Sequence, residues 1–322
     1  MTQPAQPTDW ISQLLGRPVT LPPRTSVDQI PAARAFWDLS HVNRDLPELA
    51  AVHDRVVLRE REGLALTAEI YVPKGQGPFP TMLYLHGGSW VLWSAAHLRK
   101  LGMGIAAQGI VVANLEYGLA PEHPFPWAVE DSVYAARWLT ENADRYGGRP
   151  GGLLIGGDSA GANLAAAAIV ALNGPEHLVD GGALAGTPVT FSGALLSYGI
   201  FDFPLLFVEP GRNAAGGVIE TTWNLAYLGP NFIKYHREPL VSPIYAPNLS
   251  AFPPTYLSCG DRDALLPQSL AMAKALVQAG VPTTLSVVEG GDHAFLMMPD
   301  VIPGAGPERQ RIYAWLLEKG GR

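Results

Sequence analysis

A serine stands between two glycines in residues 153–170, LLIGGDSAGANLAAAAIV, where an apolar run meets an alanine-rich one. The first run predicts a buried strand and the second a helix, so Gly157, Ser159 and Gly161 fall in the turn between them. A G-x-S-x-G turn of this kind strains the serine backbone, and its flanking residues must be glycine because a Cβ there would collide with neighbouring backbone. It also exposes the hydroxyl at the strand tip, where Ser159 could attack a carbonyl carbon. The alternative is that Ser159 only caps the helix.

A serine nucleophile needs a base to take its proton and a third group to orient that base. His293 lies in a glycine-rich loop directly after the apolar run 283–288 and is the predicted base. Asp263, in GDRDALL after the apolar run 254–259, is the predicted orienting acid, which gives the chain order serine, aspartate, histidine. Six other histidines fall in segments predicted as cap, edge strand, helix or surface loop: His41, His53, His97, His123, His177 and His236.

Three further aspartates compete with Asp263 for the role of acid. Asp202 follows the apolar run 193–198, but its neighbours are typical of the start of a cap. Asp261 can satisfy backbone N–H groups of its own turn, a common structural task for aspartate. Asp292 adjoins His293, and neighbours on an extended loop tend to point apart. The sequence favours Asp263 and leaves the other three as alternatives.

A second glycine-rich turn, HGGSW at residues 86–90, follows the apolar run 81–85. Consecutive glycines let the backbone approach a substrate oxygen closely. We therefore predict that the amides of Gly87, Gly88 and Ala160 stabilise an oxyanion. His86 is predicted to brace this turn and not to act as a base.

The elements that must position these residues alternate along the chain. Continuous apolar runs predict strands at 81–85, 110–115, 152–156, 193–198, 254–259 and 283–288, with helical segments at 95–108, 126–145, 160–173, 267–280 and 307–319. The alternating pattern of 64–72 predicts a half-buried strand near a sheet edge. This alternation of strands and helices predicts a parallel sheet covered by helices. In such a sheet, ligand sites lie beyond the carboxyl ends of the strands. The serine, the histidine and both glycine-rich turns occur at such ends.

Two regions interrupt the alternation. Residues 1–50 are rich in proline, and residues 200–240 insert aromatic and helical material between two predicted strands. We expect residues 1–50 and 200–240 to form a cap over a catalytic domain made of residues 51–199 and 241–322. Three aromatic residues are candidates for an acyl pocket under the cap, although such residues more often pack a cap onto the core: Trp90, Phe203 and Phe207.

Composition excludes several other classes of protein. The chain has 322 residues, 48% of them hydrophobic and 16% charged, which is enough for one large core. A net charge of -7 without a run of Lys and Arg argues against a nucleic-acid partner. Cys259 is the single cysteine, the first ten residues lack the features of a secretory signal, and no apolar run is long enough for a membrane helix. We expect a cytoplasmic protein without stable membrane insertion and, since H-E-x-x-H and G-x-G-x-x-G motifs are missing, without a metal or cofactor.

These residues resemble the hormone-sensitive-lipase-like branch of the α/β-hydrolases, a group of serine carboxylesterases. The similarity runs from about residue 65 onward through YLHGGSW, LEYGLAPEHPFPWAVED, GGDSAGANLA, SPIYAPNLSAFPPTYLSCGDRDALL and GGDHAF. It implies an α/β-hydrolase fold with eight mostly parallel strands, flanking helices and a helical cap. It also implies hydrolysis of short- to medium-chain acyl esters through an acyl-enzyme. It assigns Ser159, Asp263 and His293 to a catalytic triad, and Gly87, Gly88 and Ala160 to the oxyanion hole.

Four positions depart from the family pattern. Ser89 stands for the third glycine of the oxyanion turn, Glu116 for an aspartate, Gly118 for an arginine and Ala162 for the glycine after GDSAG. None of them removes a catalytic group, but they leave the shape of the oxyanion turn and of the acyl pocket open.

An amidase, a formamidase or a lyase on the same scaffold is the main alternative function, because fold does not fix function. A non-catalytic binding protein is a further alternative. A plant hormone receptor that resembles the family has lost the catalytic histidine, so His293 argues against it. The expected partner is a small-molecule ester, and a homodimer is an alternative to a monomer.

Overall fold

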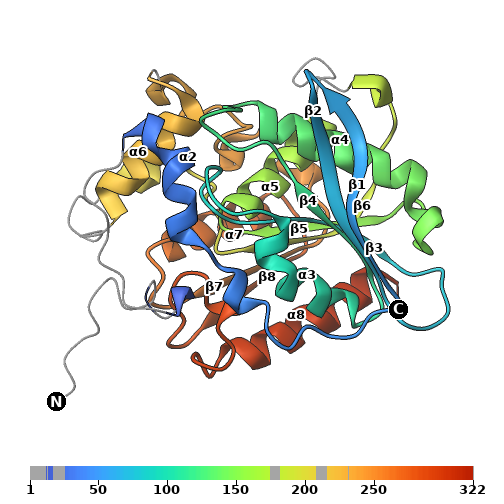
Figure 1. Ribbon diagram of the computed structural model, residues 1–322. Helices are drawn as coiled ribbons and strands as arrows, with labels where there is room; N and C mark the ends of the chain where they lie inside the picture. The colour runs from blue at the N-terminus through green and yellow to red at the C-terminus, as the bar shows by residue number, and fades with distance from the viewer. Residues whose placement is uncertain are drawn as a thin grey trace.

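The computed structural model describes residues 12, 14–16, 26–174, 182–207, 216–230 and 232–321, without the side chains of residues 207 and 216–221. Within these residues an eight-stranded sheet has the order β1-β2-β4-β3-β5-β6-β7-β8 (Figure 1). Strand β2 is antiparallel to both of its neighbours, and the remaining pairs are parallel. The strands are β1 (Ala51–Arg61), β2 (Leu64–Val72), β3 (Thr81–Leu85), β4 (Val111–Glu116), β5 (Leu153–Asp158), β6 (Phe191–Ser197), β7 (Thr255–Gly260) and β8 (Thr283–Val288). The predicted α/β-hydrolase architecture is confirmed.

The two edges of the sheet differ from the sequence-based expectation. The sequence places His53 in an edge strand but gives β1 no bounds, because this strand pairs on one side only and is largely exposed, so it carries no apolar run. It forms the edge next to β2. At the other edge, β8 was expected to be buried on both faces. Its residues are mostly half-buried or exposed, and Val287 is 46% exposed, because β7 is its only neighbour in the sheet.

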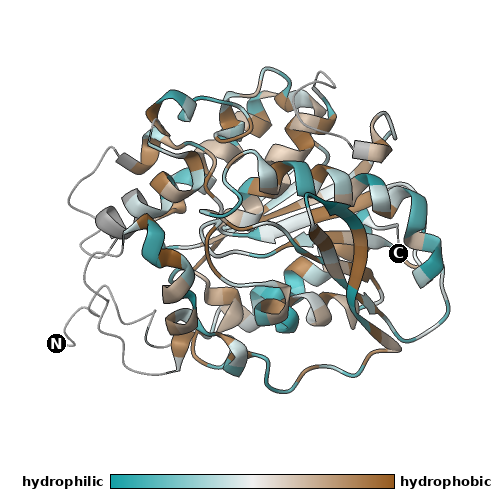
Figure 2. Cartoon of the chain, turned by 45° about the horizontal axis from the view of Figure 1, so that its top comes forward, coloured by the Kyte–Doolittle hydropathy of each residue, from teal (hydrophilic) through white to brown (hydrophobic). Residues whose placement is uncertain are grey.

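The five predicted helices are all present and cover both faces of the sheet. They are α3 (Arg99–Ala106), α4 (Trp127–Asn142), α5 (Ala160–Leu172), α7 (Leu266–Gln278) and α8 (Ala305–Lys319). Figure 1 shows α3 and α8 below the sheet and α4 and α5 above it. Most of these helices mix hydrophobic and hydrophilic residues along their length, as expected where one face meets the sheet and the other meets water (Figure 2).

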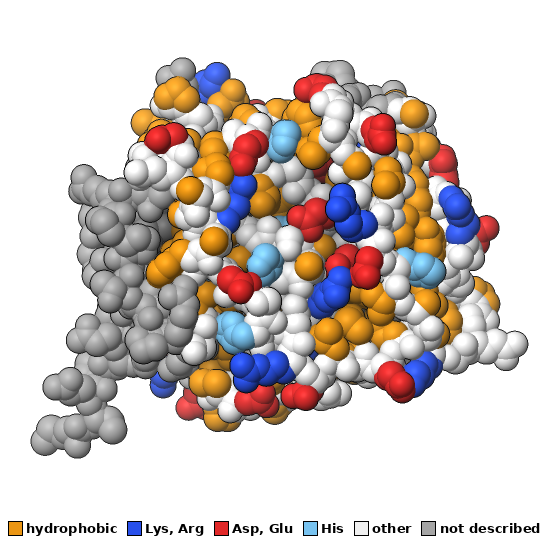
Figure 3. Space-filling model, viewed as in Figure 1, with side chains coloured by type: hydrophobic (Ala, Val, Ile, Leu, Met, Phe, Trp, Pro, Cys, Tyr) orange, Lys and Arg blue, Asp and Glu red, His pale blue; other side chains and the backbone are white. Residues whose placement is uncertain are grey.

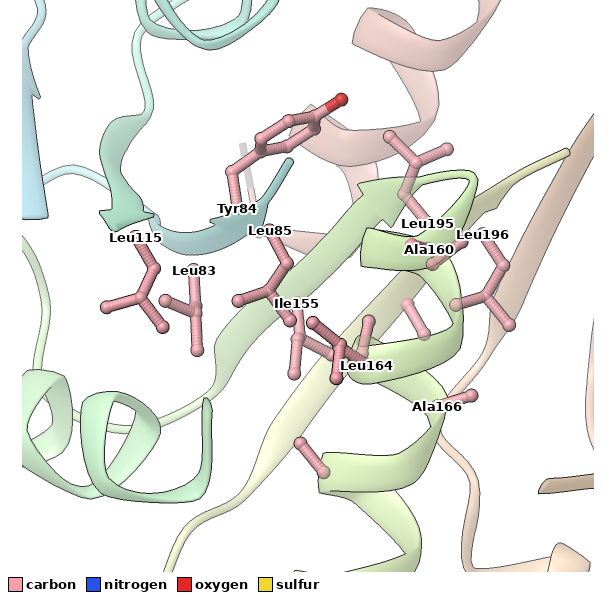
Figure 4. Close-up of a cluster of buried hydrophobic side chains, with 14 of the residues drawn as sticks. Leu83, Tyr84, Leu85, Leu115, Ile155, Ala160, Leu164, Ala166, Leu195 and Leu196 are labelled. Carbon is pink, nitrogen blue, oxygen red and sulfur yellow. The ribbon is translucent and has the colours of Figure 1, made fainter. Parts of the chain in front are cut away.

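Helix α5 is the exception, since every residue from Ala160 to Ala171 is buried. Its alanines allow close packing against β5 and α4 on several sides. Larger side chains from the strands and this helix fill the core below the serine turn, among them Leu83, Leu85, Ile155 and Leu164 (Figure 4). The residues that follow β5 therefore start from a closely packed and rigid base.

The predicted cap regions contain short helices within the described residues. Residues 26–50 include α2 (Ile30–Ala33), and residues 200–240 include α6 (Gly216–Leu228), which lies beside it in Figure 1. The ring of Trp37 meets that of Trp223 edge-on, with centroids 6.2 Å apart. The division into a cap and a catalytic domain stays a prediction. No helix among the described residues has the length and apolar character to cross a membrane.

Candidate active site

Ser159 occupies a sharp turn between β5 and α5. Its φ of +53° and ψ of −119° place a non-glycine residue in a strained region of backbone conformation. A Cβ on Gly157 would lie 2.3 Å from the Leu85 carbonyl oxygen, and one on Gly161 would lie 2.0 Å from the same atom. Both positions therefore require glycine, as the sequence predicts. The Ser159 side chain forms no capping hydrogen bond with α5, which argues against the alternative that it is only a helix cap.

Three side chains from separate loops meet at this turn. His293 Nε2 lies 3.1 Å from Ser159 Oγ, and His293 Nδ1 lies 2.8 Å from Asp263 Oδ2. The loops follow β5, β7 and β8, which are parallel, so their carboxyl ends share one edge of the sheet. With Nδ1–H donating to the carboxylate, Nε2 is left to accept the serine proton.

The carboxylate of Asp263 is fixed on both of its oxygens. Oδ1 accepts a hydrogen bond from the Leu265 amide at 2.8 Å, and the side chain is only 1% exposed. Two of the competing aspartates have other partners. Asp202 Oδ1 accepts from the hydroxyl of Tyr245 at 3.0 Å, and Asp261 Oδ1 accepts from the amide of Gly290 at 2.8 Å. Asp261 thus holds its own turn, the structural task that the sequence suggested for it.

The turn after β3 brings backbone amides toward the same place. Gly88 has φ +117°, and a Cβ there would lie 2.2 Å from the Leu92 carbonyl oxygen. Ser89, at the position of the family's third glycine, keeps a left-handed φ of +52°. The amides of Gly88 and Ser89 donate no hydrogen bond to any residue that the structure describes. Ala160 begins α5, so its amide has no partner within the helix.

Gly87 differs from the predicted role. Its amide donates to Asp158 Oδ1 at 3.1 Å, which is at odds with the prediction that it binds an oxyanion. The sequence does not single out the amide of Ser89, which donates no hydrogen bond to a described residue and is therefore available to a bound oxyanion. The available signal was its position as the third residue after His86 in the turn, where the family has glycine. Because a backbone amide is present in serine and glycine alike, the substitution keeps the donor.

His86 braces the oxyanion turn, as predicted. Its ring stacks on that of Tyr117 with centroids 4.2 Å apart, and its Nδ1 lies 2.7 Å from the Gly87 carbonyl oxygen. The Tyr117 hydroxyl donates to the His86 carbonyl at 2.7 Å. Burial lowers the pKa of His86 to about 4, so the imidazole is neutral at pH 7.

The aromatic candidates for an acyl pocket are packed against one another. Trp90 stacks on Tyr227 of α6 with centroids 4.5 Å apart, and Phe203 lies 5.5 Å from Trp90. Phe203 is fully buried and Trp90 is almost so. These contacts favour the alternative that both residues pack the cap region onto the core, and a contact with the acyl group stays a prediction. The side chain of Phe207 lies outside the described residues.

The N-terminal segment holds the oxyanion turn from the outside, a connection that the sequence does not show. Arg34 Nε donates to the Val91 carbonyl at 2.8 Å, and its guanidinium also donates to the Ala120 carbonyl at 2.9 Å. The indole N–H of Trp93 donates to the Trp37 carbonyl at 2.8 Å. Residues 34–37 therefore fix the chain directly after the turn.

Glu116, which replaces the family's aspartate, supports the chain beyond this turn. Its Oε2 accepts a hydrogen bond from the Ala95 amide at 2.8 Å. Burial raises its pKa from 4.5 to about 7, a shift that the Ala95 amide opposes and the nearby charge of Glu69 increases. A charged Glu116 therefore costs stability in the folded protein.

We expect Glu116→Gln to remove a pH dependence of stability. Between pH 4.5 and about 7 the folded state keeps a proton that the unfolded state loses, so the free energy of unfolding of the wild type falls as the pH rises. Below this window Glu116 is protonated in both states and does not affect the pH dependence. Above it Glu116 is charged in both states, and the free energy of unfolding carries the full cost of the buried charge. The gain in stability from Glu116→Gln should therefore be on the order of 2 kcal/mol larger at pH 8 than at pH 4. Urea unfolding at both pH values measures it, and an equal effect at both would contradict the expectation.

Comparison with known proteins agrees with this geometry. A family model described as alpha/beta hydrolase fold matches residues 82–297, more than half of the chain. The chain therefore belongs to this α/β-hydrolase family, as the resemblance of its motifs implies. A serine at the strand–helix turn, followed along the chain by an aspartate and then a histidine, makes it a serine hydrolase by class.

Individual relatives differ in the activity that their names describe. The chain is 29% identical to carboxylesterase NlhH of Mycobacterium tuberculosis, over 93% of this chain and 91% of that protein. It is 30% identical to 2-hydroxyisoflavanone dehydratase of Glycyrrhiza echinata, over 85% of this chain and 88% of that protein. A solved esterase structure from Pyrobaculum calidifontis superposes with a TM-score of 0.78 at 24% identity, covering 92% of this chain and 94% of that one, and shows the shared fold.

Proposed function

We propose that this protein is a carboxylesterase that hydrolyses short- to medium-chain acyl esters through an acyl-enzyme. Ser159 is the nucleophile, His293 the general base and Asp263 the orienting acid. The observation that carries the proposal is the continuous set of contacts from Ser159 Oγ through the two ring nitrogens of His293 to Asp263, at 3.1 and 2.8 Å. The name of the relative NlhH supports the same reaction.

The reaction follows from these contacts. His293 Nε2 takes the proton of Ser159 as Oγ attacks the ester carbonyl, and the carbonyl oxygen becomes an oxyanion. We assign the amides of Gly88, Ser89 and Ala160 as its donors, with the positive end of the α5 dipole adding to the stabilisation. The leaving alcohol takes the proton from His293. Water then attacks the acyl-enzyme by the same steps and releases the acid.

A lyase is the alternative that a specific observation favours, namely the likeness to a dehydratase. Elimination of water next to a carbonyl needs a base and an oxyanion site, and His293 with the same amides could supply both. Such an elimination forms no covalent intermediate on Ser159. A covalent acyl-enzyme therefore distinguishes the proposed hydrolase from the lyase.

Hydrolysis of a panel of nitrophenyl esters tests the proposal. We expect release of nitrophenol from the acetate and butyrate esters, with slower release from a long-chain ester and little cleavage of the matching nitroanilide. A burst of nitrophenol equal to the enzyme concentration would report the acyl-enzyme where its hydrolysis is the slower step. Faster cleavage of the anilide would favour the amidase, and turnover of neither compound would contradict the proposal.

The sequence-based expectations about partners and location stay proposals. On the face shown in Figure 3, basic and acidic side chains are interspersed, which is in keeping with a small-molecule partner and not with a nucleic acid. A cytoplasmic location is a further prediction from the sequence, and a homodimer stays an alternative to a monomer.

A further inference from the structure

The mechanism leaves one buried carboxylate next to the nucleophile without a role. Asp158 is the last residue of β5 and is fully buried. Its Oδ1 accepts two hydrogen bonds, one from the hydroxyl of Tyr84 at 2.9 Å and one from the amide of Gly87 at 3.1 Å. It is not the acid of the triad in this geometry, because His293 Nδ1 is bonded to Asp263.

The two hydrogen bonds tie Asp158 to β3, through Tyr84, and to the turn that follows β3, through Gly87. Tyr84 belongs to β3 and points away from the cluster formed by Leu83 and Leu85 (Figure 4). Gly87 directly precedes the two residues whose amides we assign to the oxyanion. The carboxylate of Asp158 therefore connects the strand that carries Ser159 to the turn that carries its oxyanion donors.

Gly87 also packs closely against Oδ2, the second carboxylate oxygen of Asp158. A Cβ on Gly87 would lie 2.5 Å from Asp158 Oδ2, so a larger residue at position 87 would displace the carboxylate. Glycine at this position is thus explained by its contact with Asp158 and not by an oxyanion that it would bind itself.

We propose that Asp158 is a positioning residue for the oxyanion turn. Through the amide of Gly87 it fixes the amides of Gly88 and Ser89 relative to Ser159, and it does not touch the substrate. This proposal rests on the proposed esterase function. Its physical basis is that a displacement of about 1 Å at a catalytic group costs about a hundredfold in rate.

The energetic cost of this carboxylate supports a functional reason for its presence. Burial raises the pKa of Asp158 to about 6, against the lowering effects of the bonds from Tyr84 and Gly87 and of His293. Among the described residues its Oδ2 accepts no hydrogen bond. A buried charge with one unsatisfied oxygen is destabilising, so a neutral side chain of the same shape should be more stable at this position.

Three variants test the role of Asp158: Asp158→Ala, Asp158→Asn and the control Tyr84→Phe. Asp158→Ala removes the acceptor for Gly87, and we expect kcat for nitrophenyl butyrate to fall about a hundredfold while KM changes less than about threefold, since the oxyanion forms only after binding. An asparagine oxygen can still accept from Gly87 but without charge assistance, so Asp158→Asn should lose only about tenfold. Tyr84→Phe removes the other hydrogen bond to Oδ1 and leaves that of Gly87, so its kcat should stay within about threefold of the wild type.

Two further readouts separate positioning from a general effect on folding. The affinity for phenylboronic acid, which forms a tetrahedral adduct on a catalytic serine, should weaken in the same order as kcat. The melting temperature of Asp158→Asn at pH 8 should equal or exceed that of the wild type, so that activity falls while stability does not. If Asp158→Ala does not fold, Asp158→Asn decides alone. A folded Asp158→Ala enzyme with unchanged kcat and boronate affinity overturns the proposal, and so does an unchanged Asp158→Asn enzyme when it decides alone. An inactive wild type overturns the esterase function on which the proposal rests.

Discussion

Ser159→Ala should lower the turnover of nitrophenyl butyrate by at least about 10⁴-fold, because removal of the nucleophile leaves only binding and oxyanion stabilisation. The hydroxyl lies 3.1 Å from the base on a turn that glycines at 157 and 161 hold in place. Alanine at position 159 can keep the same backbone, so the fold should be retained. The effect is measured as kcat, with circular dichroism to confirm folding.

Covalent labelling provides an independent check on the same residue. A nitrophenyl organophosphate should inactivate the wild type with one adduct per chain, and peptide mass spectrometry should place the adduct on Ser159. Ser132→Ala is a matched control, because Ser132 is also buried and its hydroxyl donates to the Ala128 carbonyl within α4. An adduct on another residue, or substantial turnover by Ser159→Ala, would show that the nucleophile is assigned wrongly.

Asp263→Asn is expected to have the second largest effect, a loss of at least about a hundredfold in kcat; the corresponding change in a serine protease costs about 10⁴. An asparagine amide placed against His293 Nδ1 would donate a hydrogen bond where the carboxylate accepts one. The imidazole would then carry its proton on Nε2, the nitrogen 3.1 Å from Ser159 Oγ, and could not accept the serine proton. The side chain keeps its shape, so its bond with the Leu265 amide can be retained.

The competing aspartates are natural controls for this measurement. Asp202→Asn and Asp261→Asn remove charges whose hydrogen bonds are with Tyr245 and Gly290, and should each change kcat by less than about tenfold. Asp292→Asn belongs in the same series because Asp292 adjoins the base. A folded Asp263→Asn enzyme near the wild-type rate would transfer the role of acid to whichever of the other variants loses activity.

The sequence by itself determined the central sheet, its covering helices and the three loops that carry Ser159, Asp263 and His293. The signals are local: strands covered on both faces need continuous apolar runs, and the serine turn needs glycine at 157 and 161 because no Cβ fits there. Order along the chain then places the loops at one edge of a parallel sheet. The catalytic roles themselves stay predictions.

The tertiary structure alone decided features that depend on contacts between distant backbone groups. The amide of Gly87 is 71 residues from the carboxylate that accepts its hydrogen bond, and Arg34 is 57 residues from the Val91 carbonyl that it holds. Any residue other than proline presents the same amide and carbonyl groups, so composition cannot show which of them are already bonded. For the same reason the sequence does not show that the amide of Gly87 is already bonded to Asp158. The bounds of β1 and the exposure of β8 escaped the sequence because a strand with one neighbour is exposed in a way that only its place in the sheet determines.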